Sequence, residues 1–170
     1  AVSIGTWAGS NGGAASGPSS ISLGSSAHGF GSNSISLGSY NWAAGETTVS
    51  IGAGSYASSV NSIAIGRSVT TDRWGQVVIG AFNVFTTNYT NTPQPTDQIF
   101  VVGNGTADDA RSNAFVIKRN GDVDVSGELT VNSQPAATQA DVDQKIQTER
   151  TTSDAAYYRV NQPLVVPNAT

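Results

Sequence analysis

Residues 20–66 read SISLGSSAHGFGSNSISLGSYNWAAGETTVSIGAGSYASSVNSIAIG, and this stretch decides the fold of the chain. A glycine returns every fourteen residues within and just beyond it, at Gly24, Gly38, Gly52, Gly66 and Gly80. A triplet whose first and third residues are Val, Ile or Leu precedes each of these glycines. A fixed period of this kind is typical of a solenoid, in which one small unit stacks on copies of itself.

The triplets predict short strands. Their apolar–x–apolar alternation has the period of two that suits a β-strand with one buried face. A further copy, Val2–Ile4, precedes Gly5 and lies nineteen residues ahead of Gly24 instead of fourteen. The sequence therefore predicts an all-β fold for at least its first half.

The residues after each repeat glycine alternate between small and bulky. We expect the small ones to point inward, where coils approach closely, and the bulky ones to point outward. Because stacked coils place equal positions about one strand spacing apart, His28, Trp42 and Tyr56 should form one ladder. The ladder either covers a neighbouring coil or chain or, together with Tyr40, forms a recognition face for a glycan or a protein.

Composition limits the partners of the chain. Its 170 residues carry a net charge of −4, and its eight Lys and Arg are scattered, which argues against nucleic acid as a partner. No apolar run has the length that membrane insertion requires. Cys is absent, which excludes a disulfide framework and a thiolate metal site. A lone chain of this composition buries little apolar area, so we expect it to gain its core by association.

Residues 20–31 and 62–66 resemble the head repeat of the Yersinia-adhesin type of trimeric autotransporter. The resemblance covers about residues 1–82, and similar repeats occur in bacteriophage fibres and other virion proteins. It implies a homotrimeric, left-handed parallel β-roll with the triplets packed around the threefold axis. The implied trimer core consists of Ile21, Leu23, Ile35, Leu37, Val49, Ile51, Ile63, Ile65, Val77 and Ile79.

The remaining chain predicts a loop, a region of short strands, and a helix with a tail. Pro93 and Pro95 argue against a central strand in the loop. Strands are expected at 99–102 and 113–118, and Asn120-Gly121 is a hairpin turn signal. The predicted regions are a β-roll domain at 1–82, a Pro-containing loop at 83–98, a short-strand β region at 99–137, and a helix and extended attachment tail at 138–170.

The last region begins with a helix signal. Thr138 followed by Asp141 favours a helix start, and we expect the helix to run to about Tyr158. Its apolar seam is too short for an independent coiled coil, so it requires the trimer or another surface. The tail either docks along a partner as an added strand or packs against its own trimer. Its candidate attachment residues are Pro163, Leu164, Val165, Val166 and Pro167.

The sequence offers little that indicates chemistry. The only histidine, His28, falls on the ladder position. Asp122 and Asp124 follow a turn, and solvated carboxylates explain them better than a calcium loop does. Gly103-Asn104-Gly105 lacks the Lys-Ser/Thr of a phosphate loop. We therefore predict no catalytic residue, no cofactor and no metal.

These observations favour a non-enzymatic, homotrimeric virion structural protein of a bacteriophage. It would be a capsid decoration (cement) protein or a short tail-fibre segment on the particle surface, with capsid or tail proteins as partners and a host-surface glycan or protein as a further one. The alternative is the head of a bacterial trimeric surface adhesin, which would bind host matrix or glycan through the ladder. A third hypothesis is a tail-spike enzyme that degrades polysaccharide with Asp72 or Asp109.

Overall fold

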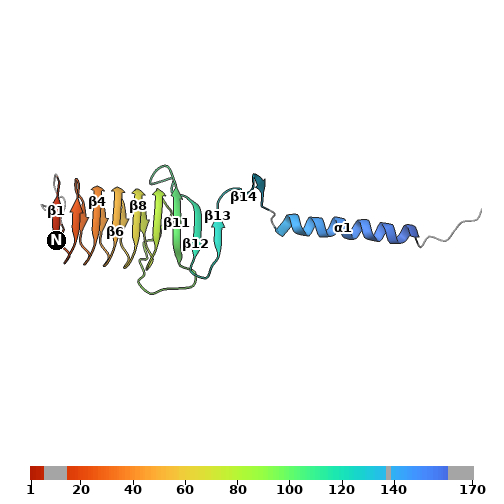
Figure 1. The fold of residues 1–170 in the computed structure, drawn as a ribbon, viewed down its shortest axis with the longest axis horizontal. Coiled ribbons are helices and arrows are strands. Elements are labelled where there is room, and N and C mark those ends of the chain that lie inside the picture. The colour runs from red at the N-terminus through yellow and green to blue at the C-terminus, as the bar shows by residue number, and fades with distance from the viewer. Residues whose placement is uncertain (6–14, 137–138, 161–170) are drawn as a thin grey trace, which may run out of the picture. The chain divides into compact units, whose positions relative to one another are not determined.

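The computed structural model describes residues 1–5, 15–136 and 139–160. The chain is mostly β-strand and contains a β-solenoid of about four turns and one helix near its C-terminus. It divides into two compact units, Ala1–Gly127 and Glu128–Thr170. Figure 1 shows that the labelled strands of the first unit, from β1 to β13, follow one another along one sheet in the order of the chain.

One long sheet of nine strands runs through the whole first unit. Its neighbours pair in parallel from the first strand to the seventh, and the last two strands are added antiparallel. In order, the strands are β1 (Val2–Ile4), β2 (Ile21–Leu23), β4 (Ile35–Ser39), β6 (Val49–Ala53), β8 (Ile63–Arg67), β10 (Val77–Ala81), β11 (Gln98–Asn104), β12 (Asn113–Lys118) and β13 (Val123–Val125).

The register stacks equivalent residues of successive triplets. Val49 of β6 pairs with Ile35 on one side and with Ile63 on the other. The repeat glycines stack in the same way, and they bring neighbouring backbones into close contact. A Cβ atom on Gly52, whose φ is +126°, would lie 1.9 Å from the carbonyl oxygen of Gly66. Glycine is therefore required here, because the next coil occupies the space of a side chain.

A second, smaller parallel sheet forms the other wall of the coils. It consists of β3 (His28–Gly29), β5 (Trp42–Ala43), β7 (Tyr56–Ala57) and β9 (Thr70–Thr71). Ala27, Ala43 and Ala57 are fully buried, so small side chains fill the interior at these positions, as the alternation predicted.

The composition of the coil interior changes along the stack. The middle residue of each triplet is fully buried in β2 to β11, and it is Ser22, Ser36 and Ser50 in the early strands. The same position holds Ala64, Val78 and Val101 in the later strands. The serines are accommodated by hydrogen bonds within their own coil: Ser36 Oγ donates to the carbonyl of Asn41, and Ser50 Oγ to that of Ser55, both at 3.0 Å.

The parallel stack continues past residue 82. The chain leaves the sheet after β10, and it returns as β11, where Val77 pairs with Phe100 and Gly80 with Gly103. The segment Phe100–Gly103 thus occupies the place of another triplet and glycine. The hairpin of β12 and β13 then extends the sheet, with Gly121 at a φ of +93° in its turn. The predicted strand at 113–118 and the predicted turn are both confirmed.

The second unit holds a small hairpin and the helix. The hairpin pairs β14 (Thr130–Val131) with β15 (Gln134–Pro135). The helix α1 (Gln139–Val160) begins and ends within two residues of the predicted limits. All side chains of residues 140–154 are exposed, including Val142 and Ile146 at 43% and 41%. Most helical stability in proteins comes from tertiary packing of an apolar face, and Val142 and Ile146 are the large apolar side chains that residues 140–154 leave exposed.

Candidate functional site

The predicted trimer-core residues lie together on one face of the long sheet. Because side chains alternate along a strand, the first and third residues of each triplet point away from the coil interior while the middle residue points into it. The outward residues are half-buried, and Ile65 is 39% exposed. Every one of these ten positions carries Val, Ile or Leu. The sheet thus presents a continuous apolar surface, which we call the outer sheet face.

The outer sheet face is larger than the ten predicted residues. Each of the nine strands contributes two apolar side chains to it, because β1 and the strands after β10 keep the same alternation. The additional members are Val2, Ile4, Phe100, Val102, Phe115, Ile117, Val123 and Val125. Sequence reasoning missed Phe100 and Val102 as members, although Phe-Val-Val-Gly at 100–103 repeats the triplet–glycine pattern.

The aromatic ladder forms as expected from the repeat. His28 pairs with Trp42, and Trp42 pairs with Tyr56, on neighbouring strands of the small sheet. The ring centroids of successive members are 5.3 and 5.7 Å apart, and the rings meet edge to face. Phe30 stacks on His28 at 5.0 Å and lies 6.0 Å from Trp42. This geometry is favourable for aromatic pairs, so the rings stabilise neighbouring coils and one another.

The ladder still offers an apolar surface to solvent. Trp42 is 45% exposed and Phe30 is 43% exposed. Tyr89, from the loop after β10, extends the ladder because its ring lies 6.1 Å from that of Tyr56. Burial raises the pKa of Tyr89, and the nearby Tyr56 and Asp72 raise it further, so its hydroxyl stays protonated at neutral pH.

Tyr40, the fourth residue predicted for the recognition face, differs from the ladder residues. It has a φ of +54° and is 67% exposed. Ser26 and Ser68 occupy the equivalent corner of other coils with similar φ values, which shows that the fold itself requires no aromatic ring there. Its exposed ring is therefore available to a partner.

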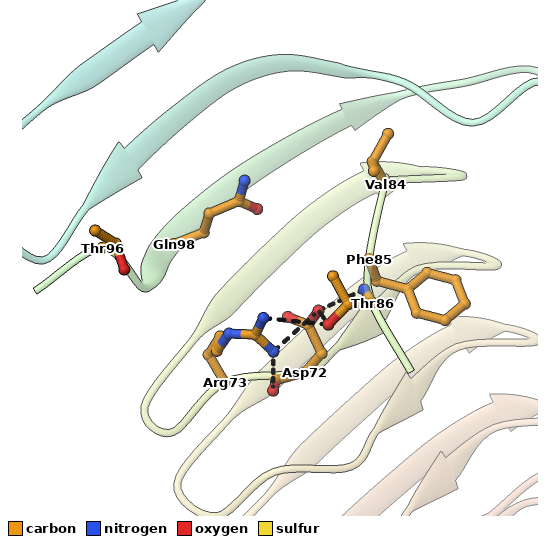
Figure 2. A pocket seen from close by; sticks show the side chains of 7 residues that line it. All are labelled: Asp72, Arg73, Val84, Phe85, Thr86, Thr96 and Gln98. Carbon is orange, nitrogen blue, oxygen red and sulfur yellow. Dashed lines mark hydrogen bonds and ion pairs between the residues drawn. The ribbon is translucent and has the colours of Figure 1, made fainter. Parts of the chain in front are cut away.

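A network of ion pairs holds the loop after β10 against the coils. Figure 2 shows Asp72 and Arg73 beside the loop residue Thr86. The carboxylate of Asp72 accepts a hydrogen bond from the backbone N–H of Thr86 at 2.6 Å and lies 3.3 Å from Arg73 Nη1. Arg73 Nε lies 3.3 Å from a carboxylate oxygen of Asp97, at the other end of the loop. Opposite charges and hydrogen bonds thus pair both buried carboxylates, as buried charges require.

The network borders a hollow of about 140 Å³, lined also by Val84, Phe85, Thr96 and Gln98. Because Asp72 is 4% exposed and is engaged by both Thr86 and Arg73, its observed role is to hold the loop. Asp109, the other carboxylate considered for polysaccharide cleavage, is exposed in the turn that follows β11.

The carboxylates after β12 lie at the hairpin surface. Asp124 forms an ion pair with Lys118 at 2.9 Å, and Asp122 accepts a hydrogen bond from the side chain of Asn120 at 2.8 Å. The hydrogen bond and the charge of Asp124 raise the pKa of Lys118. Within the described residues, no group of three His, Cys, Asp or Glu side chains could hold a metal ion.

The candidate attachment residues Pro163, Leu164, Val165, Val166 and Pro167 lie outside the described residues. No helix among the described residues combines the length and the apolar character that crossing a membrane requires. Comparisons of the chain with protein-family models, with curated proteins and with solved structures gave no match.

Proposed function

We propose that the chain is a non-enzymatic structural protein that acts as a homotrimer on the surface of a bacteriophage particle. The observation that carries the self-association is the outer sheet face. Two apolar, partly exposed side chains from each strand amount to on the order of several hundred Å², which approaches the roughly 800 Å² per partner of a stable interface. Apolar surface of this extent marks an interaction site on a soluble domain.

A further copy of the same chain is the partner that this face fits best. The face repeats with the spacing of the coils, and an identical copy aligned in parallel repeats with the same spacing. Uncharged Val, Ile and Leu side chains at the first and third positions of each triplet suit the desolvated centre of an oligomer interface. Three copies, rather than two, follow from the resemblance to trimeric autotransporter heads, and so does the proposed left-handed turn of the coils.

The helix supports association independently. Its exposed Val142 and Ile146 would be buried if helices of several copies packed together, and their separation by four residues places them on one side of the helix. The position on a virion, as a capsid decoration protein or a tail-fibre segment, rests on the occurrence of similar repeats in phage fibres and other virion proteins.

The mass of the protein in solution tests the proposal. We expect about three times the chain mass of 17.4 kDa by light scattering. Leu37→Asp should yield monomers, because a carboxylate in the centre of the interface would be buried without a partner. Tyr40→Asp is the matched control, since it adds the same charge at an exposed corner and should leave the mass unchanged. A parent protein that is monomeric at micromolar concentration would contradict the proposal.

Binding of the labelled trimer to purified capsids and to purified tails then separates the two virion locations. Binding to neither would leave the second candidate function, the head of a bacterial surface adhesin. The observation that favours this candidate is the exposure of Trp42 and Phe30 on the aromatic ladder. It predicts that host-surface glycans or matrix proteins change the fluorescence of the parent protein and bind Trp42→Ala more weakly.

A further inference from the structure

The outward side chains of the coils are nearly interchangeable from one coil to the next. From β2 to β10, each strand presents two residues drawn only from Val, Ile and Leu. If a neighbouring copy shifted by one coil along the stack, all of these pairs except the terminal one would still meet a pair of the same kind. These layers therefore specify the lateral contact but specify its axial register weakly, as in other repetitive strands.

Two adjacent layers of the outer sheet face, those of β11 and β12, differ from the rest. Phe100 of β11 and Phe115 of β12 both lie on this face, next to Val102 and Ile117. Their ring centroids are 6.2 Å apart, with the planes at 73°. Both side chains are half-buried, so the pair retains surface to offer to a partner. Phe100 and Phe115 are the two aromatic residues among those that we assign to the outer sheet face.

We propose that Phe100 and Phe115 fix the axial register in which copies of this chain associate, an inference that rests on the self-association proposed above. In register, the phenylalanine pair of one copy packs against the same pair of its neighbours. A shift by one coil would set the Phe115 layer of one copy against Val123 and Val125 of its neighbour. It would also set the neighbour's Phe100 layer against Val77 and Ile79, so large rings would be mismatched with smaller side chains at both places. Aromatic side chains at the centre of an interface also carry a large share of its binding energy.

The phenylalanine pair can align whole copies of the chain, and not only the strands that carry it. A distinctive local feature suffices to set the register of an otherwise uniform seam, as one polar layer does in coiled coils. The Phe100–Phe115 pair lies where the parallel stack gives way to the antiparallel hairpin. It therefore aligns the irregular ends of the copies at the same time as their coils.

Cysteine cross-linking can read the register directly, because the chain contains no cysteine of its own. Leu37→Cys and Ile51→Cys place a thiol on the outer sheet face of neighbouring strands, at positions that pair within one chain. Chains carrying one or the other substitution, distinguished by tags of different size, are co-expressed and oxidised. Links between like positions report the aligned register, and Leu37→Cys to Ile51→Cys links report a shift by one coil.

We expect links between like positions to exceed unlike ones several-fold in the parent background. In a Phe100→Leu/Phe115→Leu background the ratio should fall to near unity while the mass stays that of an oligomer. Phe85→Leu is the matched control and should leave the ratio unchanged, because Phe85 lies in the loop after β10, where its ring packs against Arg111 at 4.8 Å. If the double variant loses its β-sheet circular dichroism, Phe115→Leu alone replaces it in the experiment. This single substitution should lower the ratio by a smaller amount.

The outcomes separate the two proposals. An oligomer whose ratio is unchanged by both phenylalanine variants would overturn the register proposal and leave the self-association intact. A monomeric parent protein would overturn both.

Discussion

The early and late coils of the solenoid share the same strand pairing and apolar outward residues, but they differ in the side chains that fill their interior. Around β4 and β6 the interior is polar and closed by hydrogen bonds from Ser36 and Ser50. Around β8 to β12 it contains an apolar cluster formed by Ala57, Ala64, Val69, Val78, Val101 and Val116. The comparison shows that this coil does not depend on a hydrophobic interior. It requires small residues whose polar atoms are satisfied, and a backbone that permits close stacking.

The repeat glycines should be equally indispensable in both regions, which is the largest effect that we predict. A Cβ atom would lie 2.1 Å from the Gly52 oxygen in Gly38→Ala and 2.2 Å from the Gly103 oxygen in Gly80→Ala. Each substitution should lower the free energy of unfolding by about 4 kcal/mol, from backbone strain and overlap together. Urea unfolding at fixed protein concentration measures it.

Gly75→Ala is the control for the glycine variants. Gly75 also has a positive φ, of +64°, but no heavy atom beyond its chain neighbours lies within 4 Å of its ideal Cβ. Its cost should be only about 1 kcal/mol, the strain of the left-handed conformation. If Gly38→Ala and Gly80→Ala were no worse than this control, the close approach of the coils would not be the reason for the glycine repeat.

Two buried asparagines, one in each region, should contribute about equally to the free energy of unfolding. Asn41 donates to the carbonyls of Leu37 and Gly52 and accepts from the N–H of Ser55. Asn83 accepts from the N–H of Thr70 and donates to its carbonyl at 3.0 Å. Replacing either by Ala leaves several buried backbone groups unpaired and should cost about 3 kcal/mol. Hydrogen exchange should show lost protection at Ser55 in one variant and at Thr70 in the other.

These asparagines show how far the sequence could be read. The strict period predicted the stacked strands, the ladder and the inward small residues, because stacking repeats the same geometric demand at every coil. Asn41 could be assigned to the interior, but its three partners could not, since they depend on backbone atoms of two neighbouring coils. The sequence did not predict that β11 continues the parallel stack. The long loop between Phe82 and Phe100 interrupts the fourteen-residue period, although the strand pairing continues across it.

The ion pairs that hold the loop after β10 could not be predicted from the sequence either. Asp72, Arg73 and Asp97 come together only because the loop folds back along the coils. The residue types alone, two carboxylates and a guanidinium, were compatible with a structural ion pair and with the polysaccharide cleavage considered for Asp72.

Substituting the buried middle residue of a triplet should lower the free energy of unfolding more in the late coils than in the early ones. Val78→Ser removes buried methyl groups and adds a hydroxyl among Ala64 and Val101, and it should cost about 3 kcal/mol. Ser50→Ala, in the polar region, removes one hydrogen bond and should cost about 1 kcal/mol. Ala64 stands in the equivalent place one coil later, which shows that the backbone accepts the smaller residue. Thermal unfolding of both variants at one protein concentration measures the difference, and equal costs would contradict the distinction between the regions.

The smallest predicted effect is a gain, and it also separates the two regions. Tyr40 and Phe82 occupy the same corner of their coils, with φ values of +54° and +43°, a conformation that is unfavourable for aromatic residues. Phe82 is 6% exposed and packs under the guanidinium groups of Arg67 and Arg111, at 5.3 and 5.7 Å. Tyr40 is 67% exposed and gains no comparable burial.

Tyr40→Asn should therefore raise the free energy of unfolding by up to about 1 kcal/mol, because Asn tolerates the left-handed conformation better. Phe82→Asn should lower it, because the burial and the two cation–π contacts are lost together. Urea unfolding at equal protein concentration gives both values. A loss of stability in Tyr40→Asn would mean that the ring has contacts beyond its own chain, most directly with a neighbouring copy, and would move Tyr40 from a candidate recognition residue to an interface residue.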